Sequence, residues 1–147
     1  MKPKISSKIF LSLGLVFVLG SVITEMHGGT AASPQDQQLL VITIHSTGDV
    51  TRGKTGSFVL DMKPPLMFGG TYVNFSVSGT AVSGVDYVPV VSPAYIGQSG
   101  YGVVLVQTLP DRRASYSRKA YSVVVTVEPD LTYALGEPKS AQMMIKP

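Results

Sequence analysis

From Leu39 onward, hydrophobic and polar residues alternate in short runs. In Thr71–Val77, for example, Val73, Phe75 and Val77 fall on one side and polar residues on the other. A period of two is typical of a strand with one buried face. The pattern predicts seven strands: Leu39–His45, Gly56–Met62, Thr71–Val77, Tyr87–Ser92, Tyr101–Thr108, Tyr121–Val127 and Ser140–Lys146.

The segments between these runs are rich in glycine, proline and small polar residues, which form turns. They recur about every 8–12 positions, and no segment shows the period of a helix. This spacing predicts an immunoglobulin-like antiparallel β-sandwich of about seven strands. The run Tyr121–Val127 is the most apolar and is expected to be central, whereas Pro89 places Tyr87–Ser92 at an edge.

Residues 1–32 have the pattern of a secretory signal peptide. Three lysines precede the apolar run Ile9–Ile23, and small residues follow it around Ala32. The alternative is an uncleaved membrane anchor, although a helix of this run would span only about 22 Å of a hydrocarbon core of about 30 Å. Residues 33–38 are expected to form a short polar tail, and residues 39–147 the β-sandwich domain.

The charge balance and the lack of cysteine argue against two classes of function, nucleic-acid binding and thiol chemistry. The chain has 12 basic and 9 acidic residues, and residues 1–32 hold three lysines and Glu25, so the rest has 9 basic and 8 acidic residues. A nearly neutral domain does not favour nucleic acid as a partner. The chain has no cysteine, so the predicted domain is held by burial without disulfides, and thiol chemistry is excluded.

The stretch Gly79–Tyr87, with the sequence GTAVSGVDY, is the most distinctive turn of the chain. Gly79 and Gly84 allow backbone angles that other residues resist. Asp86 is expected to cap the turn, and the Tyr87 ring to enter the core.

Four segments occur in the order found in one known family: GKTGSFVLDM, VNFSVSGTAVSGVDYVPV, IGQSGYGVVLVQTLPD and YSVVVTVEPDLTYALGEPKSAQMMI. From Val41 to Ile145 the chain therefore resembles a Calx-beta domain, a single copy of a module common in bacterial surface proteins. Many of its members bind calcium through acidic side chains at one end of the sandwich.

The resemblance also implies that the calcium site is lost. Arg52 stands where the family has an acidic residue, while Asp86 and Asp111 keep two of the family's acidic positions. Cations stand at the other expected acidic positions: Arg112, Arg113, Arg118 and Lys119. Because calcium needs six to eight oxygen ligands, mostly carboxylates, no bound metal and no other cofactor is expected. The alternative is a calcium-binding Calx-beta module that uses Asp86 and Asp111.

Two arrangements of these charges stay open at this point. Arg52 or Arg112 would neutralise Asp86 and Asp111 through charge-assisted hydrogen bonds, in the place of the metal. Alternatively, the charges form a solvated rim in which they barely interact.

No residue pattern indicates catalysis. His45 is the only histidine after residues 1–32, and the chain has no cysteine, so no second ligand or partner of this kind is available for a metal site or a catalytic pair. The acidic residues lie mostly in turns, where capping is their usual role. The prediction is therefore a protein that is not an enzyme.

The basic loop holds the candidates for binding a partner: Arg112, Arg113, Tyr116, Arg118 and Lys119. Cations beside an aromatic ring suit an anionic glycan or an acidic protein, and a solvated loop is the alternative. Together these features predict a secreted bacterial module with a structural or adhesive role, periplasmic, at the cell surface or extracellular. Its membrane contact would come only from an uncleaved signal segment.

Overall fold

The computed structural model describes residues 39–111 and 119–147, which contain ten strands and no helix. The strands are β1 (Leu40–Ser46), β2 (Val50–Thr51), β3 (Thr55–Lys63), β4 (Thr71–Val73), β5 (Phe75–Ser78), β6 (Ala94–Ile96), β7 (Tyr101–Gln107), β8 (Tyr121–Val127), β9 (Tyr133–Leu135) and β10 (Ser140–Lys146). The predicted signal peptide 1–32, the tail 33–38 and residues 112–118 lie outside the described residues.

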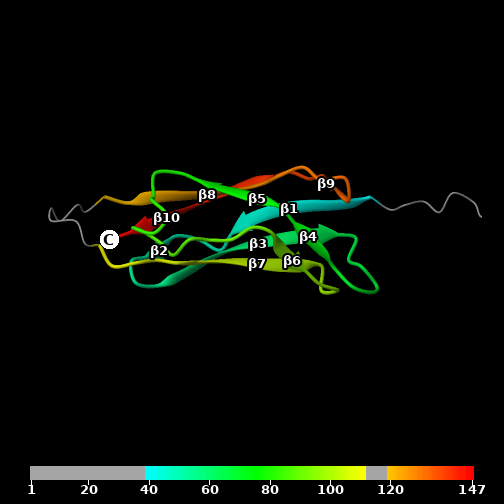
Figure 1. Cartoon of the computed structure of the whole chain (residues 1–147), viewed down its shortest axis with the longest axis horizontal. Helices are drawn as coiled ribbons and strands as arrows, with labels where there is room; N and C mark the ends of the chain where they lie inside the picture. The colour runs from blue at the N-terminus through cyan, green and yellow to red at the C-terminus, as the bar shows by residue number, and fades with distance from the viewer. Residues whose placement is uncertain (1–38, 112–118) are drawn as a thin grey trace, which may run out of the picture. The chain divides into compact units, whose positions relative to one another are not determined.

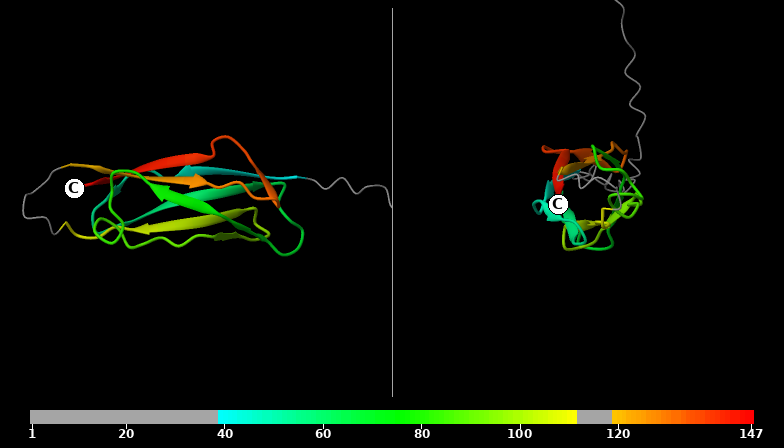
Figure 2. Two further views of the ribbon diagram at one scale, coloured as in Figure 1. Left: turned by 45° about the horizontal axis from the view of Figure 1, so that its top comes forward. Right: turned by 90° about the vertical axis from the view of Figure 1, so that its left-hand side faces the viewer.

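The described residues form two four-stranded sheets, with a small pair of strands beside them (Figure 1). The first sheet has the order β7-β3-β1-β9, and the second has the order β2-β10-β8-β5. Strands β4 and β6 make the separate pair. The end-on view in Figure 2 shows the strands of both sheets around one interior.

That interior is filled by the apolar residues of the alternating runs. Ile44 and Phe58 from the first sheet and Val123 and Met143 from the second are completely buried. In β7 every second residue is buried, as the period of two requires. Among the described residues, the buried core extends from Ile42 to Ile145.

The chain passes between the sheets several times, and in two of these passages a short strand pairs in parallel. It leaves the first sheet after β1 and joins the second as β2, which pairs in parallel with β10. It does the same from β9, which pairs in parallel with β1, to β10. The expectation of a wholly antiparallel sandwich was wrong on these two pairings, because the predicted loops 46–55 and 128–139 each contain a short strand.

The number of strands also differs from the prediction of about seven. The run Thr71–Val77 is split at Asn74 into β4 and β5, which pair with different strands, β6 and β8. Strand β6 begins inside a segment that was predicted to be a connection and a turn. Strand β8 lies between β10 and β5, which confirms that Tyr121–Val127 is an interior strand.

The prediction of an edge strand at Tyr87–Ser92 is wrong. Tyr87 makes only isolated bridges, to Ser83 and Thr108, and the N–H of Val88 donates to the carbonyl of Gln107. Beyond Val88 the segment forms no ladder. Pro89 has no N–H to donate, and most of the segment is exposed, so neither pairing nor burial holds it as a strand.

Tyr133 joins the ends of three strands. Its buried hydroxyl donates to the carbonyl of Glu128 at 2.8 Å and accepts from the N–H of Asn74 at 3.1 Å. Burial raises the pKa of the Tyr133 hydroxyl above its ordinary value. These bonds satisfy backbone groups at the position where β4 and β5 separate.

Tyr133→Phe is therefore expected to lower the free energy of unfolding by about 1–2 kcal/mol, because the partner backbone groups lose their hydrogen bonds. Chemical denaturation measures the loss. Tyr72→Phe is the matched control, since the Tyr72 side chain is exposed. Equal stability of the Tyr133 and Tyr72 variants would contradict the role of this hydroxyl.

Candidate functional site

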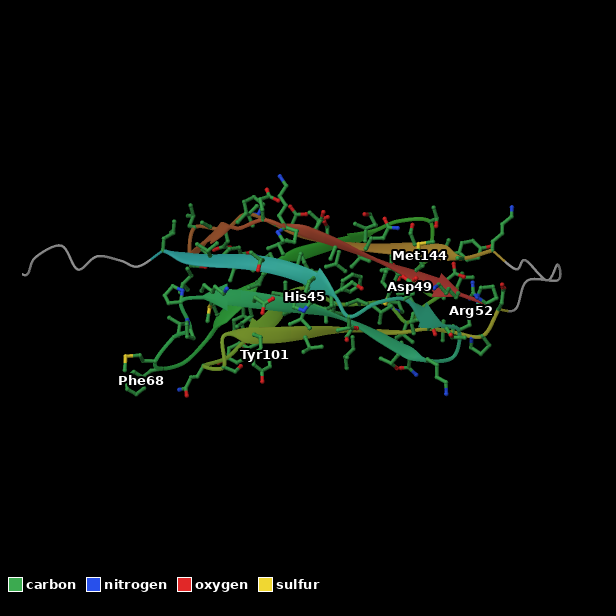
Figure 3. The ribbon with its side chains drawn as sticks, turned by 180° about the vertical axis from the view of Figure 1, so that it is seen from behind. His45, Asp49, Arg52, Phe68, Tyr101 and Met144 are labelled. Atoms are coloured by element: carbon green, nitrogen blue, oxygen red, sulfur yellow. The ribbon has the colours of Figure 1, made fainter. Side chains whose placement is uncertain are left out.

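Three connections meet at one end of the domain, here called the Arg52 end. Arg52 follows β2 directly, and its backbone N–H donates to the carbonyl of Lys146 in β10. Asp86 lies in the crossing that links β5 to the segment before β6. Leu109 and Asp111 follow β7. Figure 3 shows Arg52 at this end of the described residues.

The guanidinium of Arg52 lies against Asp86. One Nη atom is 2.6 Å from the Oδ1 atom of Asp86 and 3.7 Å from a carboxylate oxygen of Asp111. The other Nη atom donates to the carbonyl of Leu109 at 3.2 Å. The Arg52 side chain is only 9% exposed and that of Asp86 is 0% exposed, so water screens this pair far less than a surface pair.

An aromatic ring completes the surroundings of Arg52. The ring centroid of Tyr121, at the start of β8, lies 5.3 Å from the guanidinium carbon. This distance fits a cation–π contact, which is stronger when the cation is shielded from water. Arg52 is therefore held by charge, hydrogen bonding and ring contact at once.

Asp86 is also bound into its own turn. Its second carboxylate oxygen accepts from the N–H of Val82 at 2.8 Å, and its N–H donates to the carbonyl of Val82. The Tyr87 ring is buried in the core, and Gly79 and Gly84 have positive φ angles of 119° and 79°. These contacts confirm the predicted turn, with Asp86 as its cap.

The contacts also decide between the two predicted arrangements of charge. Arg52 and Asp86 form a buried ion pair, so the solvated-rim interpretation is wrong for them. Asp111 is partly exposed and lies farther from Arg52. Arg112, the other cation considered for this role, lies outside the described residues. Among the described residues, no group of three or more histidine, cysteine, aspartate or glutamate side chains is placed to hold a metal ion.

A shallow hollow of about 280 Å³ lies beside Asp86, lined by Gly84, Val85, Leu109 and Pro110. None of these four side chains titrates, so the lining supplies no acid, base or nucleophile. The hollow adds no chemistry to the ion pair.

The other candidates lie apart from the Arg52–Asp86 pair or outside the described residues. Lys119 is exposed, while Arg112, Arg113, Tyr116 and Arg118 fall in the segment 112–118 that the structure does not describe. The proposed binding role of this loop is therefore not tested.

Sequence reasoning missed two surface pairs. The Nδ1 atom of His45 lies 2.9 Å from a carboxylate oxygen of Asp61, a diagonal neighbour in the first sheet. Asp49 binds Lys146 at 2.8 Å and accepts from the N–H of Met144 in β10. The Lys146 contact and this hydrogen bond lower the pKa of Asp49. Both pairs are exposed, and the alternation of residues carries no signal for them because each joins segments that are far apart in the sequence.

Asp130, one of the acidic residues expected to cap turns, does so. It accepts hydrogen bonds from the N–H and the hydroxyl of Thr132, which lower its pKa. Across residues 39–111 and 119–147 there is no helix long and apolar enough to cross a bilayer.

The described residues therefore define an all-β protein of two four-stranded sheets with a buried arginine–aspartate pair at one end. No protein-family model matches the chain, and no curated protein matches it either. Among solved structures, the chain is similar to a conjugative transposon lipoprotein from Bacteroides eggerthii. Identity is 12% over 74% of this chain and 95% of that one, with a TM-score of 0.37. A similarity this low carries no functional argument, and the resemblance to Calx-beta domains stays a prediction from the motifs.

Proposed function

We propose that this protein is a non-catalytic, immunoglobulin-like β-sandwich module of the bacterial cell surface or exterior, in which an arginine replaces the calcium of Calx-beta domains. The observation that carries the proposal is the buried Arg52 guanidinium among oxygen atoms of Asp86, Asp111 and Leu109. The module would hold this end of its sandwich together without a metal ion.

The sheet arrangement supports the immunoglobulin-like part of the proposal. In immunoglobulin domains the first, second and fifth strands share one sheet, and the third, sixth and seventh share the other. Here β1, β3 and β7 lie in the first sheet, and β5, β8 and β10 lie in the second. Strands β2 and β9 are short additions where the first and last strands change sheets.

The chemistry of the site supports the replacement of calcium by Arg52. Calcium neutralises carboxylates and binds carbonyl oxygens, and it needs six to eight oxygen ligands to offset its dehydration. A guanidinium has a permanent positive charge and five N–H donors, so it can neutralise Asp86 and bind a carbonyl without a complete shell of ligands. Arg52 does both here, which leaves Asp86 charged, buried and satisfied.

The pattern of residues 1–32 supports export, and the absence of cysteine excludes a thiol site. A sandwich whose interior is filled by apolar side chains supports a structural or adhesive role. The alternative of a calcium-dependent module rests on Asp86 and Asp111, and a calcium titration distinguishes the two.

Thermal unfolding in the presence of calcium tests the proposal. The melting temperature of the chain from residue 33 onward is expected to differ by less than about 1 °C between millimolar calcium and chelator, since a ligand that does not bind the native state cannot stabilise it. A rise of several degrees in calcium would contradict the proposal and favour the calcium-binding alternative.

The variant Arg52→Asp tests whether the arginine occupies the position of a metal. It places a third carboxylate beside Asp86 and Asp111, so like charges should destabilise the domain in chelator. We expect millimolar calcium to restore part of the lost stability, which the wild-type protein should not require. Destabilisation without any rescue by calcium would contradict the replacement.

A further inference from the structure

The end of the domain opposite Arg52 exposes large apolar side chains at the tips of its loops. Met67 and Phe68, between β3 and β4, are 85% and 84% exposed. Leu131, between β8 and β9, is fully exposed, and Leu39 before β1 is mostly exposed. We call these four residues the apolar tip. Burying side chains of this size away from water is favourable, so their exposure points to a partner.

Strand pairing brings these residues to one end. Val41 pairs with Lys63, where the loop of Met67 and Phe68 begins. Leu40 pairs with Tyr133, where the loop of Leu131 ends. Phe68 and Arg52 lie at opposite ends of the described domain (Figure 3). The apolar tip is therefore separate from the ion-pair site.

The loop that holds Met67 and Phe68 is anchored on the domain. Leu66, directly before them, packs against the core. Pro65 covers Gly100, where even an added Cβ would lie 3.1 Å from the proline ring. Gly69 then turns the chain with a φ of 72°. The two apolar side chains are thus presented outward by a supported loop, and the core does not need them.

Two tyrosines lie directly beyond this loop. Tyr72 in β4 pairs with Tyr95 in β6, and their ring centroids are 5.1 Å apart. Both rings are exposed. Tyrosine has an apolar ring and a polar hydroxyl, so it suits the boundary between lipid and water. The order from the tip inward is thus apolar side chains first and tyrosines behind them.

We propose that the apolar tip inserts into the interface of a lipid bilayer. The described residues begin at this end, with Leu39, and the 38 residues before it include the apolar run Ile9–Ile23, which the sequence predicts to direct export through a membrane. A chain that is exported through a membrane by this segment has lipid as its nearest large apolar partner. The inference goes beyond the proposed module and does not depend on the calcium question.

The charges beside the tip predict the kind of lipid. Lys63 is the cation next to the loop of Met67, Glu128 and Asp130 both precede Leu131, and the backbone of Lys139 is bound to that of Val127 beside Glu128. This balance does not attract anionic headgroups, so burial of apolar side chains is the driving force. Binding should occur on neutral phosphatidylcholine vesicles and change little with salt.

Vesicle binding tests the proposal. The chain from residue 33 onward contains every core residue among those that the structure describes, and it lacks Ile9–Ile23, an apolar run that would bind lipid by itself. We expect it to sediment with phosphatidylcholine vesicles, and Met67→Ser/Phe68→Ser to weaken partitioning about tenfold or more. Val82→Ser/Val85→Ser, with two exposed apolar residues at the Arg52 end, is the matched control and should bind normally.

A fluorescent reporter shows which part of the protein contacts the lipid. Because the chain has no tryptophan, Phe68→Trp introduces a single one at the tip, and its emission should shift to shorter wavelength when vesicles are added. Val85→Trp should show no shift. The proposal is overturned by an absence of binding, by binding to anionic vesicles only, by equal losses in both serine variants, or by a dimer that forms through Phe68 in the absence of lipid.

Discussion

Replacing Arg52 with methionine is expected to lower the free energy of unfolding by about 3–5 kcal/mol. Methionine fills much of the volume of arginine but has no charge. Asp86, which is completely buried, would lose the cation 2.6 Å away while keeping its own desolvation cost. The measured loss is thus the cost of an uncompensated buried charge, which exceeds the value of a surface pair.

Denaturant unfolding of these three variants, Arg52→Met and the two below, separates this effect from simple loss of charge. Lys54→Met removes the same charge from an exposed side chain two positions away and is expected to change stability by at most about 0.5 kcal/mol. Arg52→Met/Asp86→Asn should recover part of the loss, because the buried carboxylate is gone. A loss below about 1 kcal/mol for Arg52→Met would mean that water screens the pair despite its burial.

The second large effect is expected at Gly79, where an alanine should cost about 3 kcal/mol or more. Its φ of 119° is unfavourable for any residue with a Cβ. The added Cβ would also lie 2.3 Å from the carbonyl oxygen of Ser122 in β8, which accepts the N–H of Ala81. The substitution would therefore push the crossing away from the strand that holds it.

Gly84→Ala is the control within the same crossing. Gly84 has a φ of 79°, but no atom lies within 4 Å of a Cβ placed there. Only the backbone cost remains, about 1–2 kcal/mol. Denaturant unfolding of the two alanine variants should therefore differ by more than about 1 kcal/mol. Equal losses of stability in the two variants would show that Ser122 moves aside and that its close approach to Gly79 does not affect stability.

The alternating pattern was a good guide where a strand keeps one partner on each side. Strands β8 and β10 have the predicted ends, and every second residue of β3 and β7 is buried. It was a poor guide at Asn74, because Val73 and Phe75 are both buried although their strands belong to different sheets. Alternation shows which side of a strand faces the core, but it carries no information on which other strand is its neighbour.

The sequence predicted only part of the site at the Arg52 end, because it does not show which groups from distant segments lie side by side. The motif resemblance singled out Arg52, Asp86 and Asp111 as one group, and the structure brings these three together. It did not indicate the ring of Tyr121 or the carbonyl of Leu109, since backbone groups and ring contacts have no sequence signature. The apolar tip was missed as well: nothing in the sequence pattern indicated that Met67 and Phe68 are exposed at the end of a loop.

The sequence by itself determined the all-β class, the buried face of most strands and the turn at Gly79–Tyr87, because burial period and glycine geometry act between neighbours along the chain. Only the tertiary structure decided the changes of sheet after β1 and β9, the burial of Arg52 against Asp86 and the gathering of apolar loop tips at the other end. Arg52 and Asp86 are 34 positions apart. Contacts of that range depend on how whole strands pair, and the pairing is set by the packing of the complete core.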